Sequence, residues 1–228
     1  MAFREANAVA LRRWVREIPA PISVALIAVT VTAAVFSVVS SRASTASLSV
    51  GFRFERSSIV LPPAAAASLG GPLSGDEIQT IERIARRELA RAYAGTRLSI
   101  GDTADAFWHI DVRNTIRGAG RAIPNAGHAV VLGPLGGLAE VNFTVLATSA
   151  IRLAPLGASR AAIVEGIGRG VGRAAVHELA HQIVSTAAMD NRTDPDSYEY
   201  SSFSRPSQYY GELHWAGAWP ILVRKVGK

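Results

Sequence analysis

The most informative stretch of this chain of 228 residues is Ala174-Ala175-Val176-His177-Glu178-Leu179-Ala180-His181. It contains good helix formers and neither Pro nor Gly, so it is predicted to be helical. Two histidines four residues apart lie on one face of a helix, one turn from each other, where both imidazoles can reach one metal ion. Glu178 lies beside them, where it can take a proton from a metal-bound water. The alternative is a helix that carries one buried and one exposed histidine by chance.

This helix is expected to run from Ser159 to about Val184, because apolar residues recur along it at helical spacing. Its middle is unusual, since each glycine there costs a helix up to about 1 kcal/mol relative to Ala. Either the helix begins only near Val171, or another element packs closely against the glycines, or the glycines bind a ligand. A nucleotide-binding loop is disfavoured, because no strand precedes the glycines and no acidic residue follows at the required distance. The glycines are Gly166, Gly168, Gly170 and Gly172.

The N-terminal region predicts export. Residues 18–41 carry no charged side chain, and residues 21–41 form an apolar run long enough to span a membrane as a helix. Arginines are more numerous before this run than after it, which places residues 1–20 in the cytoplasm and the rest outside, as in a single-pass protein of a bacterial inner membrane. The alternatives are a signal peptide cleaved near Ser44-Thr45-Ala46, which gives a secreted protein, or a buried helix of a soluble fold.

The composition narrows the chemistry. The chain contains no cysteine, which excludes thiol chemistry and cysteine-ligated zinc. The net charge of +6 comes almost entirely from arginines, which are scattered and mostly close to acidic residues, so we interpret them as parts of solvated faces. No basic cluster is interleaved with aromatic residues, and a nucleic-acid partner is therefore not expected. The oligomeric state is not indicated by any pattern in the sequence.

The remaining residues predict an α+β domain over residues 73–228, preceded by a strand and a linker in residues 42–72. Ser74 and Glu77 form a capping box, which marks the start of a helix that ends near Gly95. Alternating apolar residues predict short strands on both sides of this helix. The expected order is a strand at 47–55, a loop at 61–75, the capped helix, strands at 97–100, 107–113, 128–132 and 140–148, the histidine-bearing helix, an irregular loop at 185–207 and a C-terminal helix at 210–223 that Pro220 kinks or divides.

The motif H-E-x-x-H and this order of elements resemble the zincin metallopeptidases. In that family a small mixed sheet packs on a backing helix and on the metal helix, and the substrate lies along an edge strand. The resemblance covers about residues 73–223, and only the five-residue motif is specific. The resemblance implies a peptidase that cleaves peptides or proteins, with one Zn²⁺ held by His177 and His181 and with Glu178 as the general base. Together with the apolar N-terminal run, it predicts a membrane-anchored enzyme. The alternatives are a non-catalytic zinc-stabilised module that binds a partner at the membrane surface, or a tethered interaction protein with a fortuitous motif.

A catalytic zinc site normally has three protein ligands, so a third ligand is expected. The metzincin pattern H-E-x-x-H-x-x-G-x-x-H is not met, because Val184 stands at the glycine position and Ala187 at the last ligand position. Further on, residues 194–200 resemble the stretch D-P-x-S-x-M-Y that follows the third ligand in many metzincins, with Glu199 in place of the methionine. This resemblance, with an insertion of about three residues, implies that Asp190 is the third ligand.

Other residues are candidates for the same role. A glutamate from a later segment completes the site in gluzincins, which makes Glu199 and Glu212 alternative third ligands, and His214 is a further one. The remaining possibilities are Asp194, Asp196 or no third protein ligand. Tyr210, or Tyr209 beside it, is a candidate hydrogen-bond donor to the oxyanion of the reaction, although a tyrosine pair before a helix more often serves packing.

Overall fold

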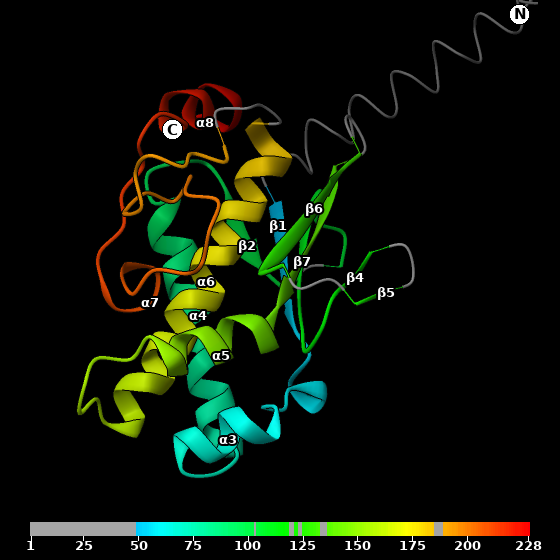
Figure 1. Cartoon of the computed structure of the whole chain (residues 1–228). Coiled ribbons are helices and arrows are strands. Elements are labelled where there is room, and N and C mark those ends of the chain that lie inside the picture. Colours follow the sequence, from blue (N-terminus) through cyan, green and yellow to red (C-terminus); the bar gives the residue numbers. More distant parts are fainter. Residues whose placement is uncertain (1–48, 103, 119–120, 123–124, 133–135, 185–188) are drawn as a thin grey trace, which may run out of the picture. The chain divides into compact units, whose positions relative to one another are not determined.

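The computed structural model describes residues 49–228 except 103, 119–120, 123–124, 133–135 and 185–188 (Figure 1). These residues belong to a single unit that extends over Ala46–Lys228. The predicted cytoplasmic segment, membrane anchor and signal cleavage site all lie outside the described residues. Within the described ranges, no helix combines the length and the apolar character that a membrane crossing requires.

A five-stranded mixed sheet forms the centre of the domain, with the strand order β2-β1-β3-β7-β6. The first four of these strands are parallel, and β6 is an antiparallel edge strand paired with β7. The expected α+β class agrees with this sheet and its flanking helices, and the early strand is an interior member of the sheet. The strands are β1 (Ser49–Phe54), β2 (Ser99–Gly101), β3 (Trp108–Arg113), β6 (Gly127–Val131) and β7 (Gly137–Asn142), with a separate hairpin of β4 (Arg117–Gly118) and β5 (Arg121–Ala122).

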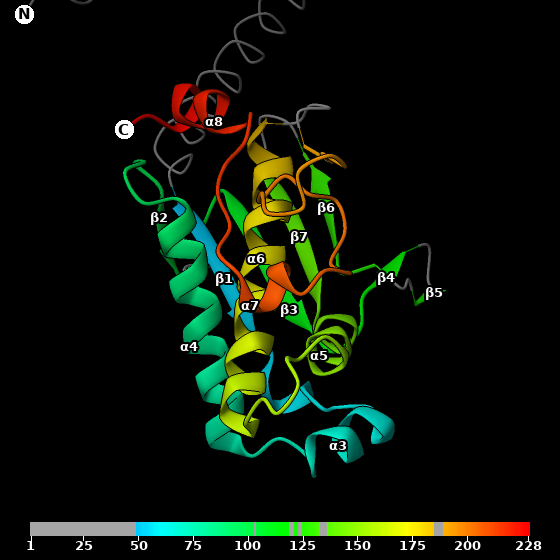
Figure 2. The same cartoon turned by 60° about the vertical axis from the view of Figure 1, so that its left-hand side comes forward.

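Alternation along the strands builds the core. Successive side chains of a strand point to opposite faces of a sheet, so residues two apart share a face. In β1, Phe52 and Phe54 are buried, and the register sets them beside Ile110 and Val112 of β3. The helices cover this apolar face (Figures 1 and 2), while the residues between them in the sequence, such as Arg53, point the other way.

The helices differ from the expectation at two points, each with a local cause. The stretch expected to be a loop contains α3 (Pro63–Leu69), because its proline occupies the first turn, where no backbone N–H is needed, and Gly70 ends it with a φ of 83°. The strand predicted at 140–148 is wrong beyond Asn142, whose side chain accepts a hydrogen bond from Val145 and caps α5 (Phe143–Arg152). The short 3-10 helix η1 (Arg56–Ser58) follows β1.

Two long helices lie side by side on the sheet, α4 (Gly75–Ala92) and α6 (Arg160–Val184), as Figure 2 shows. The capping box predicted for α4 is present. The helix α6 runs through all four glycines, so a late helix start is wrong and close packing is the explanation. A Cβ on Gly168 would lie 2.8 Å from Cβ of Ile84, and one on Gly172 would lie 2.7 Å from the carbonyl oxygen of Ala85. Gly168 and Gly172 thus allow α4 to approach α6, while Gly166 and Gly170 leave room for Tyr210 and Tyr209.

The C-terminal helix expected at 210–223 is replaced by two short helices, α7 (Ser207–Tyr210) and α8 (Trp219–Val226). Pro220 lies in the first turn of α8, where a proline is tolerated. Pro220 therefore neither kinks nor divides a helix as expected, because the break lies at residues 211–218, before the proline.

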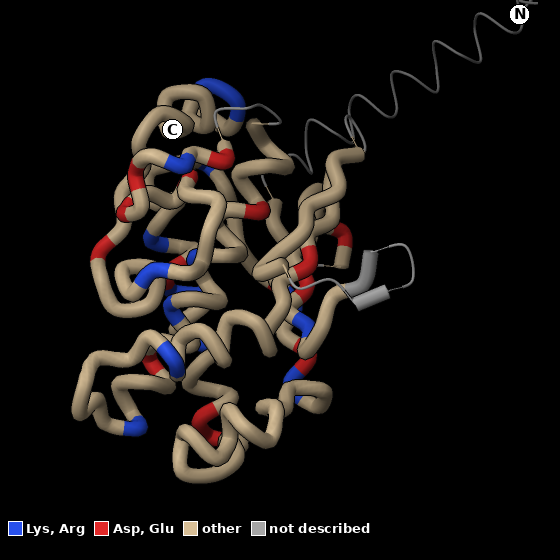
Figure 3. The backbone as a smooth tube through the Cα atoms, in the orientation of Figure 1, with Lys and Arg blue, Asp and Glu red and all other residues tan. Residues whose placement is uncertain are grey.

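Lysine and arginine alternate with aspartate and glutamate over the domain (Figure 3). Several arginines are paired with carboxylates, which agrees with the expected balance of charge, but some of these carboxylates are buried and not solvated. Arg53, for example, lies 2.5 Å from Asp111, and Arg86 lies 2.9 Å from Glu82. The carboxylates of Asp111 and Glu82 are themselves buried, so each depends on its arginine for the compensation of its charge.

Candidate metal centre

Three side chains meet near the C-terminal end of α6. The Nε2 atoms of His177 and His181 are 3.1 Å apart, and an Asp190 carboxylate oxygen lies 3.7 Å from the first and 3.6 Å from the second. A tetrahedral zinc site with bonds of about 2.1 Å places its ligand atoms about 3.4 Å from one another. The three atoms therefore have nearly the spacing of one face of such a tetrahedron, and this group could hold a metal ion.

Hydrogen bonding orients the first imidazole. Nδ1 of His177 lies 2.9 Å from the carbonyl oxygen of Tyr198. A carbonyl oxygen only accepts, so Nδ1 carries the ring proton and Nε2 presents a lone pair toward His181 and Asp190. Two facing nitrogens and a carboxylate oxygen form a set of electron-pair donors, and a bound cation would satisfy all three. The chemistry of the donor set thus fits a metal ion.

The backbone places Asp190 in this group. It has a φ of 65°, a left-handed conformation found at no other non-glycine residue among those that the structure describes. Aspartate tolerates this conformation better than most residues, yet the conformation still carries a conformational cost. Hydrogen bonds of the next residue hold this backbone conformation in place. The amide of Asn191 donates to the carbonyl of Glu199 at 2.8 Å, and the carbonyl of Asn191 accepts from the amide of Ser201 at 3.1 Å. The pKa of Asp190 is lowered, chiefly by His177, so the carboxylate is ionised and able to bind a cation.

Glu178 lies next to the metal group, which consists of His177, His181 and Asp190, and is only 7% exposed. Burial raises its pKa to about 7, so its carboxylate is a stronger base than an ordinary glutamate. Gly127 of β6 leaves the space that this side chain fills, since a Cβ at Gly127 would lie 2.6 Å from Cγ of Glu178. The edge strand β6 thus approaches α6 directly at Glu178.

The group opens into a cleft with a volume of about 730 Å³. The edge strand β6 forms one wall, the helix α5 another, and residues 201–204 a third. His177, Glu178, His181 and Asp190 all line this cleft, so a ligand that enters it would meet the metal group and the buried carboxylate together.

The alternative third ligands lie elsewhere. Glu199 is fully buried, and its carboxylate accepts hydrogen bonds from the amides of Ala216 at 3.0 Å and Ala218 at 2.8 Å. It therefore joins the irregular loop to the segment that precedes α8. In the described part of the chain, Asp190 alone completes a group of three metal-ligating side chains with the two histidines.

The other two alternatives are engaged in ion pairs. Glu212 pairs with Arg91 and, at 3.0 Å, with Arg169. His214 lies 3.0 Å from Asp194, which is itself one of the possible ligands named above. These contacts correct the expectation that Glu212 or His214 reaches the metal group.

The tyrosine pair serves packing. The Tyr210 hydroxyl donates to the carbonyl of Ala150 at 2.7 Å, and the Tyr209 hydroxyl donates to the carbonyl of Phe203 at 2.8 Å. Neither tyrosine lines the cleft. Tyr210 therefore does not have the expected position of an oxyanion donor, and its hydroxyl instead forms a hydrogen bond that joins α7 to α5.

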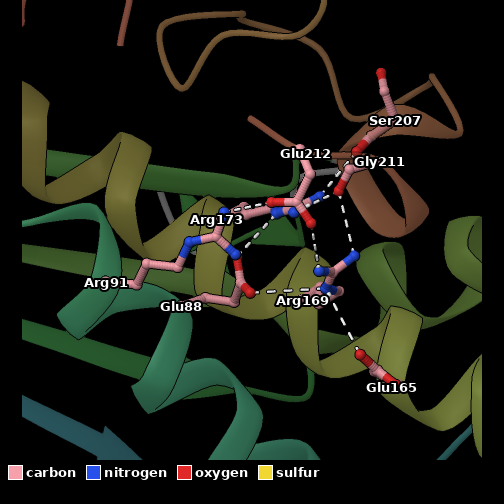
Figure 4. Close-up of polar contacts among 8 residues, drawn as sticks. All are labelled: Glu88, Arg91, Glu165, Arg169, Arg173, Ser207, Gly211 and Glu212. Carbon is pink, nitrogen blue, oxygen red and sulfur yellow. Dashed lines mark hydrogen bonds and ion pairs between the residues drawn. The ribbon is translucent and has the colours of Figure 1, made fainter. Parts of the chain in front are cut away.

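A buried arginine lies one helical turn before His177 and was not predicted by the sequence. Arg173 is 1% exposed and donates to Glu88 of α4 at 3.1 Å. It also donates to the carbonyls of Ser207 and Gly211, each at 2.8 Å (Figure 4). Burial lowers the pKa of Arg173, but the neighbouring carboxylate opposes this shift. The guanidinium thereby fastens α6 to α4 and to the segment around α7.

Arg173→Met is expected to destabilise the domain by about 3–5 kcal/mol, because it leaves the buried Glu88 carboxylate without its partner. The free energy of unfolding in urea would measure this. Arg91→Ala is a matched control, since its ion pair with Glu212 is half exposed and should contribute about 0–1 kcal/mol. Equal losses in the two variants would contradict the structural role of Arg173.

Comparisons with protein-family models, with curated proteins and with solved structures found no match for this chain. The functional conclusion therefore depends on the residues and geometry of the site.

Proposed function

We propose that this protein is a zinc-dependent metallopeptidase of zincin type. The observation that carries the proposal is the metal group itself, in which two helix-borne imidazoles and the Asp190 carboxylate have nearly tetrahedral spacing. Two further features support hydrolysis over a purely structural metal site. The buried Glu178 adjoins the group, and both line an open cleft, whereas structural zinc sites are closed by four protein ligands.

The residues of the metal group and Glu178 have different roles in the proposed cleavage of a peptide bond. When bound, Zn²⁺ supplies a Lewis acid that acidifies a water molecule and polarises the scissile carbonyl. His177, His181 and Asp190 would hold the metal ion, and the Tyr198 carbonyl keeps the first imidazole in the required tautomer. Glu178 takes a proton from the attacking water and passes it to the nitrogen of the leaving amine.

The edge strand supports the same proposal. In the zincin resemblance the substrate lies along an edge strand beside the metal helix, and here β6 is an edge strand that lines the cleft. We propose that the exported domain meets peptide or protein substrates outside the cytoplasm. Its anchorage by residues 21–41, with residues 1–20 in the cytoplasm, remains a prediction from the sequence, and secretion after signal cleavage is its alternative.

Peptide hydrolysis by the full-length protein tests the proposal. The detergent-solubilised chain, loaded with zinc, would be incubated with a peptide mixture, and products would be identified by mass spectrometry. We expect cleavage that a chelator abolishes and that added zinc restores. Zinc binding without cleavage of any peptide would favour the non-catalytic module instead.

Gly127→Ala is expected to lower kcat by about 100-fold, because the new methyl group would displace the Glu178 carboxylate and misplacing a catalytic group by about 1 Å has an effect of this size. Steady-state kinetics with a cleaved peptide would measure it. Gly101→Ala in β2 is the matched control, since a Cβ there meets no atom within 4 Å. Unchanged kinetics in the Gly127 variant would contradict the proposed placement of the base.

A further inference from the structure

One cationic side chain lines the cleft that the metal group also lines. Arg152 lies in the last turn of α5 and is exposed, and it supplies the single guanidinium or ammonium group among the described residues around the cleft. Many arginines of this domain face a carboxylate, as Arg173 faces Glu88. Arg152 has no such partner within ion-pair distance in the described ranges, and its interaction there is with Tyr209. Its charge is therefore free to meet a ligand.

The guanidinium of Arg152 determines the sign of the net charge in the zinc-loaded cleft. Its carboxylates belong to Glu178 and Asp190, next to the metal ligands. A bound Zn²⁺ carries two positive charges and compensates both, so Arg152 leaves the loaded cleft with an excess of positive charge. An anionic group on a substrate would be attracted to this end of the cleft, whereas a cationic group would be repelled.

Hydrogen-bond donors surround the same space. Ser149 lies one turn before Arg152 on α5 and also lines the cleft, where its side chain is hydrogen-bonded to that of Tyr209. On another wall, Ser202 and Ser204 also line the cleft, and their hydroxyls are hydrogen-bonded to each other at 2.8 Å. Hydroxyls and a guanidinium are the donors that bind carboxylates in proteins, and arginine offers two parallel N–H groups to both carboxylate oxygens.

We propose that the cleft selects peptides that carry a carboxylate, which Arg152 binds while the scissile bond lies at the metal group. This inference rests on the proposed peptidase function and names its substrate class. The carboxylate belongs either to an Asp or Glu side chain or to the C-terminus of the peptide, and both present the same group to the guanidinium. Arg152 is then a specificity-determining residue at the α5 wall of the cleft.

Matched peptides test the inference with the full-length, zinc-loaded protein. One set places Asp or Glu, Asn or Gln, and Lys at each position around a cleaved bond, and a second set compares free with amidated C-termini. A hydrogen-bonded charge contributes about 1.5–3 kcal/mol, so kcat/KM should favour the carboxylate peptides by about 10- to 100-fold. In Arg152→Ala this ratio should fall to about 1, and Arg152→Glu should favour lysine peptides. Loss of preference in the first or the second set identifies the source of the carboxylate.

Arg87→Ala is the control variant, because Arg87 is exposed on α4, outside the cleft, and its loss changes the net charge equally. It should keep the full preference. Equal cleavage of acidic and neutral peptides by the unmodified protein, or a preference that survives in Arg152→Ala, would overturn the inference while leaving the peptidase function intact.

Binding separates the inference from the proposed function. Fluorescence anisotropy with labelled acidic and neutral peptides would measure affinity for the zinc-loaded protein without any need for turnover. Arg152-dependent binding of acidic peptides without cleavage would support the carboxylate site and contradict the peptidase. If the protein neither binds acidic peptides selectively nor cleaves any peptide, both the carboxylate site and the peptidase function are contradicted.

Discussion

Glu178→Gln is expected to lower kcat by at least about 10²- to 10⁴-fold, the range that a positioned general base contributes. Glutamine has nearly the same shape as glutamate but cannot accept the proton of the attacking water. The variant should retain its zinc, because Glu178 lies outside the group of His177, His181 and Asp190. Steady-state kinetics and metal analysis of the same preparation would measure the two effects.

Glu140→Gln is a suitable control for this variant. Glu140 lies on β7, where it pairs with Arg113 at 3.3 Å, and it does not line the cleft. Its substitution should leave kcat unchanged. Undiminished hydrolysis by Glu178→Gln would remove this residue from the mechanism, and loss of zinc would mean that it acts as a ligand.

Alanine at His177, His181 or Asp190 is expected to weaken zinc binding by more than the roughly 10- to 100-fold that the loss of an outer-shell partner costs. Each substitution removes one of the three ligand atoms that the structure brings together. Competition with a chromophoric chelator would measure the zinc affinity of each variant.

Asp194→Ala is the matched control for Asp190→Ala, because both residues lie in the irregular loop and Asp194 pairs with His214 instead. It should bind zinc as tightly as the unmodified protein. Equal zinc affinity in the Asp190 and Asp194 variants would show that another residue completes the site.

Zinc should also stabilise the fold, because a ligand at 100 times its Kd adds about 2.7 kcal/mol to the free energy of unfolding. The unmodified protein should therefore unfold at a higher temperature with zinc than with a chelator. The unfolding temperature of His181→Ala should be the same under both conditions.

Local patterns predicted the helix that carries the site. Apolar spacing located α6 almost to the residue, and the capping box of Ser74 and Glu77 located the start of α4. Both signals operate within one helix or one turn, so the sequence alone contains them. Asp190 was inferred from a loop resemblance, and the structure brings its carboxylate to the histidines.

Other features depend on contacts between distant segments. Arg173 appears in the sequence as one of many arginines, and its burial follows from the approach of α4 that Gly168 and Gly172 permit. Glu199 stands at the position of a possible ligand, but the amides of Ala216 and Ala218 bind it. No local spacing encodes these partners, which lie between 17 and 85 residues away along the chain.

The strand predicted at 140–148 shows how two local signals compete. Its apolar residues suit a buried strand, but Asn142 is also a good helix cap. Packing of α5 against α6 decides in favour of the helix after this residue. That decision matters for function, because α5 forms a wall of the cleft and carries Arg152.

Anomalous diffraction at the zinc absorption edge, from crystals of the zinc-loaded protein, tests the metal centre most directly. We expect one peak, bound by Nε2 of His177, Nε2 of His181 and a carboxylate oxygen of Asp190 at about 2.0–2.2 Å, with the remaining position open to the cleft. A site closed by a fourth protein ligand would contradict the catalytic account. The absence of a peak between these three residues would contradict the metal centre itself.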